Sequence, residues 1–182
     1  MKRVLVIMFV LFLSVWAAAG NFSEYYSRFI AANSMQDAQA MKEVVALLQA
    51  DTSNASLTAL YINAVTEYAN WAVKDEKERE KFYQQAVDYG KKIIKENKDN
   101  WYLYYTLGAA YGRLAQFKGI VSSLFMLGDF DANIKKSIEL NPSNYLGYVA
   151  LGMRYRDVPW PMNDMKKSEE NFKKAIEKEP LY

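Results

Sequence analysis

The sequence NWYLYYTLGAAY begins at residue 100, and a changed copy of it, NYLGYVALGMRY, begins 44 residues later at residue 144. The two copies share the pattern aromatic-x-x-Leu-Gly-x-x-Tyr. At helical spacing these four positions lie on one face. A glycine on that face lets a neighbouring helix approach closely, while the aromatic residues fill the space on either side. The pattern therefore predicts packed pairs of helices that repeat along the chain.

A second helical stretch follows each copy and stops near a proline. Residues 133–140 lead to Pro142, and residues 166–178 lead to Pro180. A proline cannot continue a helix, and it turns the chain into the next unit. An earlier and weaker copy of the pattern lies in residues 61–98, and strand signals are scarce throughout. We therefore expect an all-α fold, in which one leading helix in residues 20–53 precedes three helical hairpins wound into a right-handed superhelix, at about 54–99, 100–143 and 144–182.

The repeated unit resembles the tetratricopeptide repeat. The residues of the last unit that match its motif are Tyr148, Leu151, Gly152, Tyr155, Ser168, Phe172, Ala175 and Pro180. Those of the middle unit are Tyr104, Leu107, Gly108, Tyr111, Phe130, Ile134, Ser137 and Pro142. The units are longer than the ~34 residues of an ordinary repeat, and the surplus lies between the two helices of each hairpin. This layout is similar to that of the secreted T component of TRAP transporters, and also to microtubule-dynamics-regulator-like repeat proteins.

The first 19 residues, MKRVLVIMFVLFLSVWAAA, have the pattern of a secretory signal. Two basic residues precede an apolar run, and small residues follow it, which predicts cleavage before Gly20. The run is shorter than the ~20 residues that a membrane-spanning helix needs, although an uncleaved anchor is an alternative. We therefore expect an exported protein of the periplasm or the extracellular space, with no integral membrane segment after cleavage.

The composition excludes several classes of chemistry. The chain has 182 residues and contains neither His nor Cys, which excludes disulfides, zinc fingers and Ser-His-Asp triads. Its formal net charge of +2 resides in Lys2 and Arg3, so that the mature chain is neutral and nucleic acid is not an expected partner. Glu67 and Asp157 lie in apolar surroundings, but satisfied polar residues are expected there rather than general bases. We therefore expect a non-catalytic protein without a cofactor.

The segment Asp129-Phe-Asp131-Ala-Asn133 resembles the opening of a calcium-binding loop. Such a loop also needs glycine at its sixth position and glutamate at its twelfth, where this chain has Ile134 and Leu140. We therefore expect the acidic residues to cap a helix N-terminus, and we expect no metal site.

The resemblance to tetratricopeptide repeats implies that the first helix of each hairpin lines a concave groove. The positions that it carries over as groove residues are Tyr102, Tyr105, Arg113, Met153 and Arg156. Such a groove suits an extended peptide or a protein partner, and we expect a scaffold that binds a protein, for example a transporter's solute-binding component. The alternative is a carrier of a small apolar or amphipathic ligand whose acid group faces Arg113 or Arg156. A third arrangement is also open, in which the leading helix itself fills the groove.

A second candidate is the apolar segment GIVSSLFMLG, residues 119–128. It either extends the hairpin and packs in the core, or forms an exposed patch for a partner, a second subunit or a membrane surface. Trp160, which stands between Pro159 and Pro161, presents the same two alternatives.

Overall fold

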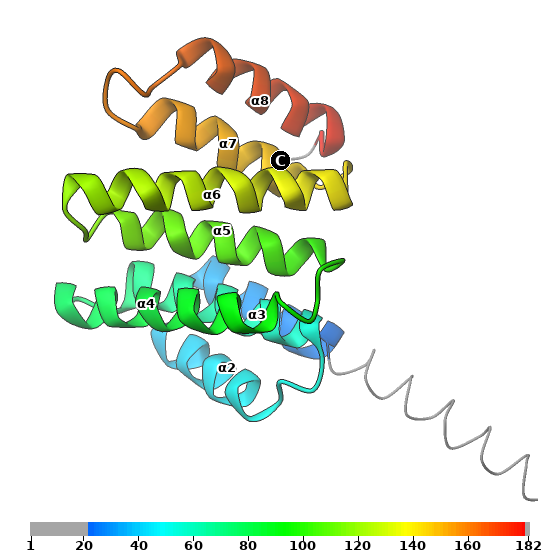
Figure 1. The fold of residues 1–182 in the computed structure, drawn as a ribbon. Coiled ribbons are helices and arrows are strands. Elements are labelled where there is room, and N and C mark those ends of the chain that lie inside the picture. Colours follow the sequence, from blue (N-terminus) through cyan, green and yellow to red (C-terminus); the bar gives the residue numbers. More distant parts are fainter. Residues whose placement is uncertain (1–21, 181–182) are drawn as a thin grey trace, which may run out of the picture.

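The computed structural model describes residues 22–180, which form helices and turns and contain no strand. The all-α prediction is therefore confirmed. The helices are 22–35, α2 (Ala38–Ala50), α3 (Ala55–Glu67), α4 (Glu76–Ile93), α5 (Trp101–Ala115), α6 (Ile120–Leu140), α7 (Tyr145–Asp157) and α8 (Met165–Lys178), and the π-helical turn η1 (Tyr68–Ala72) continues α3 (Figure 1). The predicted signal and its cleavage site lie outside the described residues.

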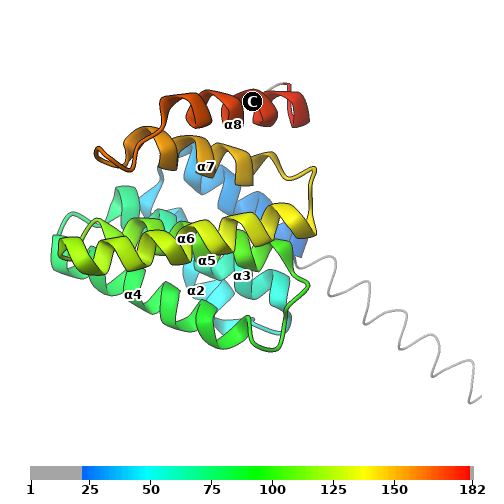
Figure 2. The ribbon, with the colours of Figure 1, turned by 45° about the horizontal axis from the view of Figure 1, so that its top comes forward.

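The helices form a stack of hairpins. Helix 22–35 packs with α2, α3 with α4, α5 with α6, and α7 with α8, and Figures 1 and 2 show that the pairs follow one another from the N-terminal end to α8. One apolar core runs through the stack from Phe29 to Leu151. Within residues 22–180 no helix is both long enough and apolar enough to cross a membrane.

The leading segment differs from the single helix that we expected. Gln36 has a φ of 50°, in the left-handed region, and it divides the segment into helix 22–35 and α2. Asp37 then caps α2 by accepting a hydrogen bond of 2.9 Å from the backbone N–H of Ala40. The described chain therefore contains four hairpins, because the leading segment is itself a hairpin.

Asparagines begin the first helix of each later hairpin. The side chains of Asn54, Asn100 and Asn144 accept hydrogen bonds from backbone N–H groups in the first turns of α3, α5 and α7. The amide of Asn144 also donates to the Ser137 hydroxyl at 3.0 Å, and that of Asn100 donates to the Ser56 hydroxyl at 3.3 Å. Asn100 and Asn144 therefore both start a helix and attach it to the preceding hairpin.

The glycines of the repeated motif lie at the closest helix contacts. A Cβ added at Gly108 of α5 would lie 2.8 Å from the Ile134 side chain of α6. One added at Gly152 of α7 would lie 2.7 Å from the Phe172 ring of α8. Both distances are too short for real carbon atoms, so only glycine fits without a shift of its neighbour. The prediction that these glycines allow close helix approach is confirmed.

Helix α6 is much longer than the stretch 133–140 that the sequence predicted. It has 21 residues, whereas α7, which runs back along it, has 13. At 1.5 Å per residue these lengths are about 31 Å and about 20 Å, so the first turns of α6 extend beyond the end of α7. The surplus residues of the middle unit therefore form helix rather than loop.

Candidate functional site

The groove expected at Tyr102 and Tyr105 is filled by the chain's own first helix. Tyr102 is only 7% exposed, and the Phe22 ring meets its ring edge-on at a centroid distance of 6.5 Å. The amide of Asn63 donates to the Tyr102 hydroxyl at 2.9 Å, and burial raises the pKa of that hydroxyl. Tyr105 stacks on Tyr102 with ring centroids 6.3 Å apart. Of the arrangements that the sequence left open, the structure has the one in which the leading segment occupies this space.

The remaining predicted groove residues lie at other places in the stack. Arg113 is half-buried in α5. Burial raises the pKa of the Tyr83 hydroxyl, and the positive charge of Arg113 makes that rise smaller. Met153 is exposed on α7. Arg156 donates two hydrogen bonds to Asp157, at 2.6 and 3.1 Å, which lowers the pKa of that carboxyl. The structure thus brings Tyr102 and Tyr105 together, and the binding role of all five groove residues stays a prediction.

Arg154 is a structural residue that the sequence analysis missed. Its Nε and Nη2 atoms donate to the two oxygens of Asp131 on α6, at 3.0 and 3.1 Å. Its Nη1 atom donates to the Met162 carbonyl at 3.0 Å, and its guanidinium lies 4.7 Å from the centre of the Tyr155 ring. This clamp fixes the loop between α7 and α8 against α6.

We had expected the acidic residues of the calcium-like segment to cap a helix N-terminus, and this prediction is wrong. Asp129 and Asp131 lie inside α6, and Asp131 is the ion-pair partner of Arg154. Within the part of the chain that the structure describes, no group of acidic side chains is arranged to hold a metal ion.

The start of α6 carries large apolar side chains in solvent. Ile120, Val121, Leu124 and Phe125 are 83%, 68%, 47% and 75% exposed. Together they present an apolar area of about 500 Å², which is the size of the largest patches on ordinary monomers, and such patches are often functional. We call these four residues, with Gly128, the α6 apolar surface. Of the two alternatives for residues 119–128, the structure therefore has the exposed patch.

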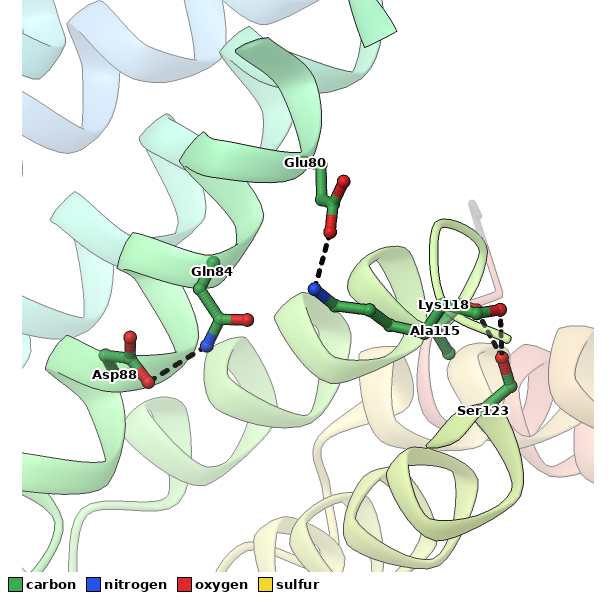
Figure 3. Close-up of polar contacts among 6 residues, drawn as sticks. All are labelled: Glu80, Gln84, Asp88, Ala115, Lys118 and Ser123. Atoms are coloured by element: carbon green, nitrogen blue, oxygen red, sulfur yellow. Dashed lines mark hydrogen bonds and ion pairs between the residues drawn. The ribbon is translucent and has the colours of Figure 1, made fainter. Parts of the chain in front are cut away.

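Polar contacts hold the base of this surface in place (Figure 3). The Lys118 ammonium pairs with the Glu80 carboxylate of α4, with 2.5 Å between Nζ and Oε1. The Ser123 hydroxyl lies 2.7 Å from the Ala115 carbonyl oxygen and 3.0 Å from that of Lys118, so it ties the first turn of α6 to the end of α5. Phe117, in the turn between the helices, packs against Tyr83 with ring centroids 5.6 Å apart. The apolar side chains are therefore displayed on an anchored helix.

Trp160 is a further exposed aromatic residue on the side of the molecule where α6 begins. It lies in the loop between α7 and α8 and is 84% exposed. Figures 1 and 2 show this loop at the same end of the molecule as the start of α6. Of the two alternatives for Trp160, packing in the core or exposure, the structure therefore shows exposure.

A family model describes most of this architecture. The model of regulator of microtubule dynamics protein 1-3 matches residues 24–158, from the first helix to the end of α7. The chain belongs to this family. No curated protein matches the chain. The matched range includes the α6 apolar surface and most of helix 22–35, although Phe22 itself lies just before it.

Membership of the regulator of microtubule dynamics family corrects two predictions. The assignment to tetratricopeptide proteins of the TRAP T-component type is wrong, and the second resemblance, to microtubule-dynamics-regulator-like repeats, pointed to the family that matches. The predicted export to the periplasm or the extracellular space is also wrong, because a family of microtubule regulators is not an exported one. The shared helical-hairpin layout explains the first error, since layout alone does not separate the two families.

Proposed function

We propose that this chain is a non-catalytic interaction module that binds another protein through the α6 apolar surface. The observation that carries the proposal is the exposure of Ile120, Val121 and Phe125 on a helix whose base is anchored by Lys118 and Ser123. A rigid apolar surface binds a partner without first losing much conformational freedom, and its aromatic member is the type of residue that dominates binding energy.

The position of Phe125 makes it the expected centre of binding. Its side chain is 75% exposed, with Val121 one turn earlier on the same helix. Removing a centrally buried aromatic anchor from an interface costs at least about 2 kcal/mol, which weakens binding by roughly 30-fold. The groove at Tyr102 offers no comparable surface, because Phe22 already covers it. No observation of this structure favours the small-ligand alternative over the protein partner.

The family name indicates which partner to test first. Proteins of this family are named as regulators of microtubule dynamics, so polymerised tubulin is a defined probe for the proposed surface. We expect the full chain to sediment with microtubules, or to retain specific proteins in affinity purification, and to lose that binding in Phe125→Glu. The charge would then have to be buried in an apolar interface without a partner.

Two control variants make the experiment specific. Gln85→Glu adds the same charge at an exposed position of a different helix, α4, and should bind like the wild type. Met153→Glu adds it at an exposed groove residue on α7 and should also bind normally. The proposal is wrong if no protein depends on Phe125, or if Met153→Glu abolishes binding and Phe125→Glu does not.

A further inference from the structure

Arg79 of α4 contacts two other parts of the chain at once. Its Nε atom donates to the Ala69 carbonyl at 3.2 Å, and its Nη2 atom donates to the Asn70 carbonyl at 3.0 Å. Its guanidinium carbon lies 5.8 Å from the centre of the Phe117 ring. Ala69 and Asn70 belong to η1, and Phe117 belongs to the turn between α5 and α6. The half-buried Arg79 side chain therefore bridges η1 and the turn from which α6 starts.

The η1 end of this bridge is fixed. The last carbonyl groups of a helix have no partner within it, and η1 ends at Ala72. A positive charge is also favourable there, because the helix dipole makes the C-terminal end of a helix negative. The Trp71 indole N–H donates to the side-chain oxygen of Asn33 in helix 22–35, at 2.9 Å. Arg79 thus binds backbone groups of a turn that is itself attached to the first hairpin.

The Phe117 end of the bridge lies where α6 begins. Gly119, the residue before α6, has no side chain that could cap the helix, so the direction of the first turn depends on the contacts of the preceding turn. The Phe117 ring also contacts Tyr83, which follows Arg79 by four residues on the same face of α4. A shift of the Phe117 ring would therefore move the start of α6 with it.

A guanidinium suits this bridge better than an ammonium does. Its planar fork can donate two hydrogen bonds in its plane while its face lies against an aromatic ring. A lysine at residue 79 would keep the charge and lose this combined geometry. The ion pair of Lys118 with Glu80 joins α4 to the same turn (Figure 3), and Arg79 extends that attachment to η1.

We propose that Arg79 is a positioning residue of the α6 apolar surface and acts through Phe117. It holds the turn between α5 and α6 against η1, and it thereby sets the direction in which the first turns of α6 present Val121 and Phe125. This inference rests on the proposed function, since it concerns the orientation of the same surface, but the local effect of Arg79 is measurable in the chain alone.

Hydrogen exchange of the full chain, followed by NMR for individual amides, measures this effect. Losing either half of the bridge should shift a local opening equilibrium about fivefold. We expect the amides of residues 123–127 to exchange about fivefold faster in Arg79→Lys, and those of α7 and α8 to keep their rates. Arg28→Lys makes the same change at an exposed position of helix 22–35 and should leave residues 123–127 unchanged.

A second variant tests whether Arg79 acts through Phe117. Phe117→Leu removes the ring and keeps an apolar side chain, and it should also speed exchange at residues 123–127. The double variant should exchange no faster than the faster single variant, because two groups of one bridge do not contribute independently. A foreign protein that depends on Phe125 should bind Arg79→Lys up to about fivefold more weakly, since the correctly oriented surface is then less populated.

The outcomes separate this inference from the proposed function. Unchanged exchange at residues 123–127, an equal increase throughout the chain, or additive effects in the double variant would overturn the positioning role, and Phe125→Glu would still decide the proposed function. A Phe125-dependent protein that binds Arg79→Lys as tightly as the wild type also overturns the positioning role. Faster exchange confined to residues 123–127, without any Phe125-dependent protein, supports the action of Arg79 on α6 and contradicts the proposed function.

Discussion

Replacing Gly152 with alanine should loosen the last hairpin, whereas the same replacement at Gly128 should stabilise the protein. The two glycines lie within helices of the same stack and differ in their surroundings. A Cβ at Gly152 would lie 2.7, 2.8 and 2.9 Å from three ring atoms of Phe172, and a Cβ at Gly128 would meet nothing. Comparing the two variants therefore isolates the energetic cost of crowding a Cβ at residue 152 against the Phe172 ring.

The magnitude follows from two contributions. Alanine is more favourable than glycine in a helix interior by about 1 kcal/mol, and this gain applies at both positions. At Gly152 the rigid Phe172 ring must move, and overpacking of this kind costs about 1–3 kcal/mol. We expect Gly128→Ala to raise the free energy of unfolding by about 1 kcal/mol, and Gly152→Ala to lower it by up to about 2 kcal/mol.

Thermal unfolding measures the difference in stability between the two variants. In a chain of this length each kcal/mol shifts Tm by about 2–4 °C, so the two variants should differ by about 2–12 °C. Adding Phe172→Leu to Gly152→Ala removes ring atoms from the contact and should recover part of the loss. If Gly152→Ala is as stable as Gly128→Ala, the motif glycine is not what allows α8 to approach α7.

Three further predictions concern individual contacts. Arg154→Lys keeps the charge but loses the paired hydrogen bonds to Asp131, so urea unfolding should show a loss of about 1–3 kcal/mol. Asn144→Ala removes a helix cap and a partner of the Ser137 hydroxyl, and calorimetry should show a loss of about 1–2 kcal/mol. Burial raises the pKa of the Tyr111 hydroxyl from 10.0 to about 12. The contribution of the neutral hydroxyl to the free energy of unfolding is therefore complete below pH 10 and is lost as the pH rises to 12. Tyr111→Phe should therefore lose less stability than the wild type between pH 10 and pH 12, as followed by circular dichroism.

The sequence predicted the helix pairs because the repeated motif encodes their contacts directly. Gly108 and Gly152 must be small, and Ile134 and Phe172 fill the space that they leave. Each packing partner lies within the same unit, so a comparison of the units with each other was sufficient to find it. Asn100 and Asn144 cap the starts of α5 and α7, and a cap is also a local signal, because it acts on the residues next to it.

The break of the leading segment was harder to predict because its signal is weak. No proline or glycine stands between residues 30 and 40, and the turn is made by Gln36, which adopts the left-handed region at some cost. Asp37, a preferred N-cap residue, was the one local indication of a new helix. A turn of this kind is stabilised by the packing of the two helices that it joins, which local patterns do not show.

The fate of the groove could not be deduced from local patterns either. The residues next to Tyr102 in the sequence do not show whether its ring faces solvent or Phe22, because the covering residue lies 80 positions earlier in the chain. Likewise, the run Ile120 to Leu127 is as apolar as a core helix, and its exposure depends on where α7 ends. Long-range packing decides both cases, and hydrophobicity alone predicts burial in each of them.

The covered groove at Tyr102 and the exposed start of α6 have one physical origin. Both follow from where the chain places residues beyond those of the repeated helix pairs. The N-terminal residues form an additional hairpin, and Phe22 at its start covers Tyr102 of α5. The surplus residues of the middle unit lengthen α6 to 21 residues, while α7 stays at 13. A helix longer than its neighbour must leave its end uncovered, and here that end carries Phe125 rather than charged residues. Apolar side chains at such an end destabilise nothing in the isolated chain, but they lower its solubility unless another surface covers them. Lengthening α6 with apolar residues thus exposes an apolar surface at the side of the stack where α6 begins.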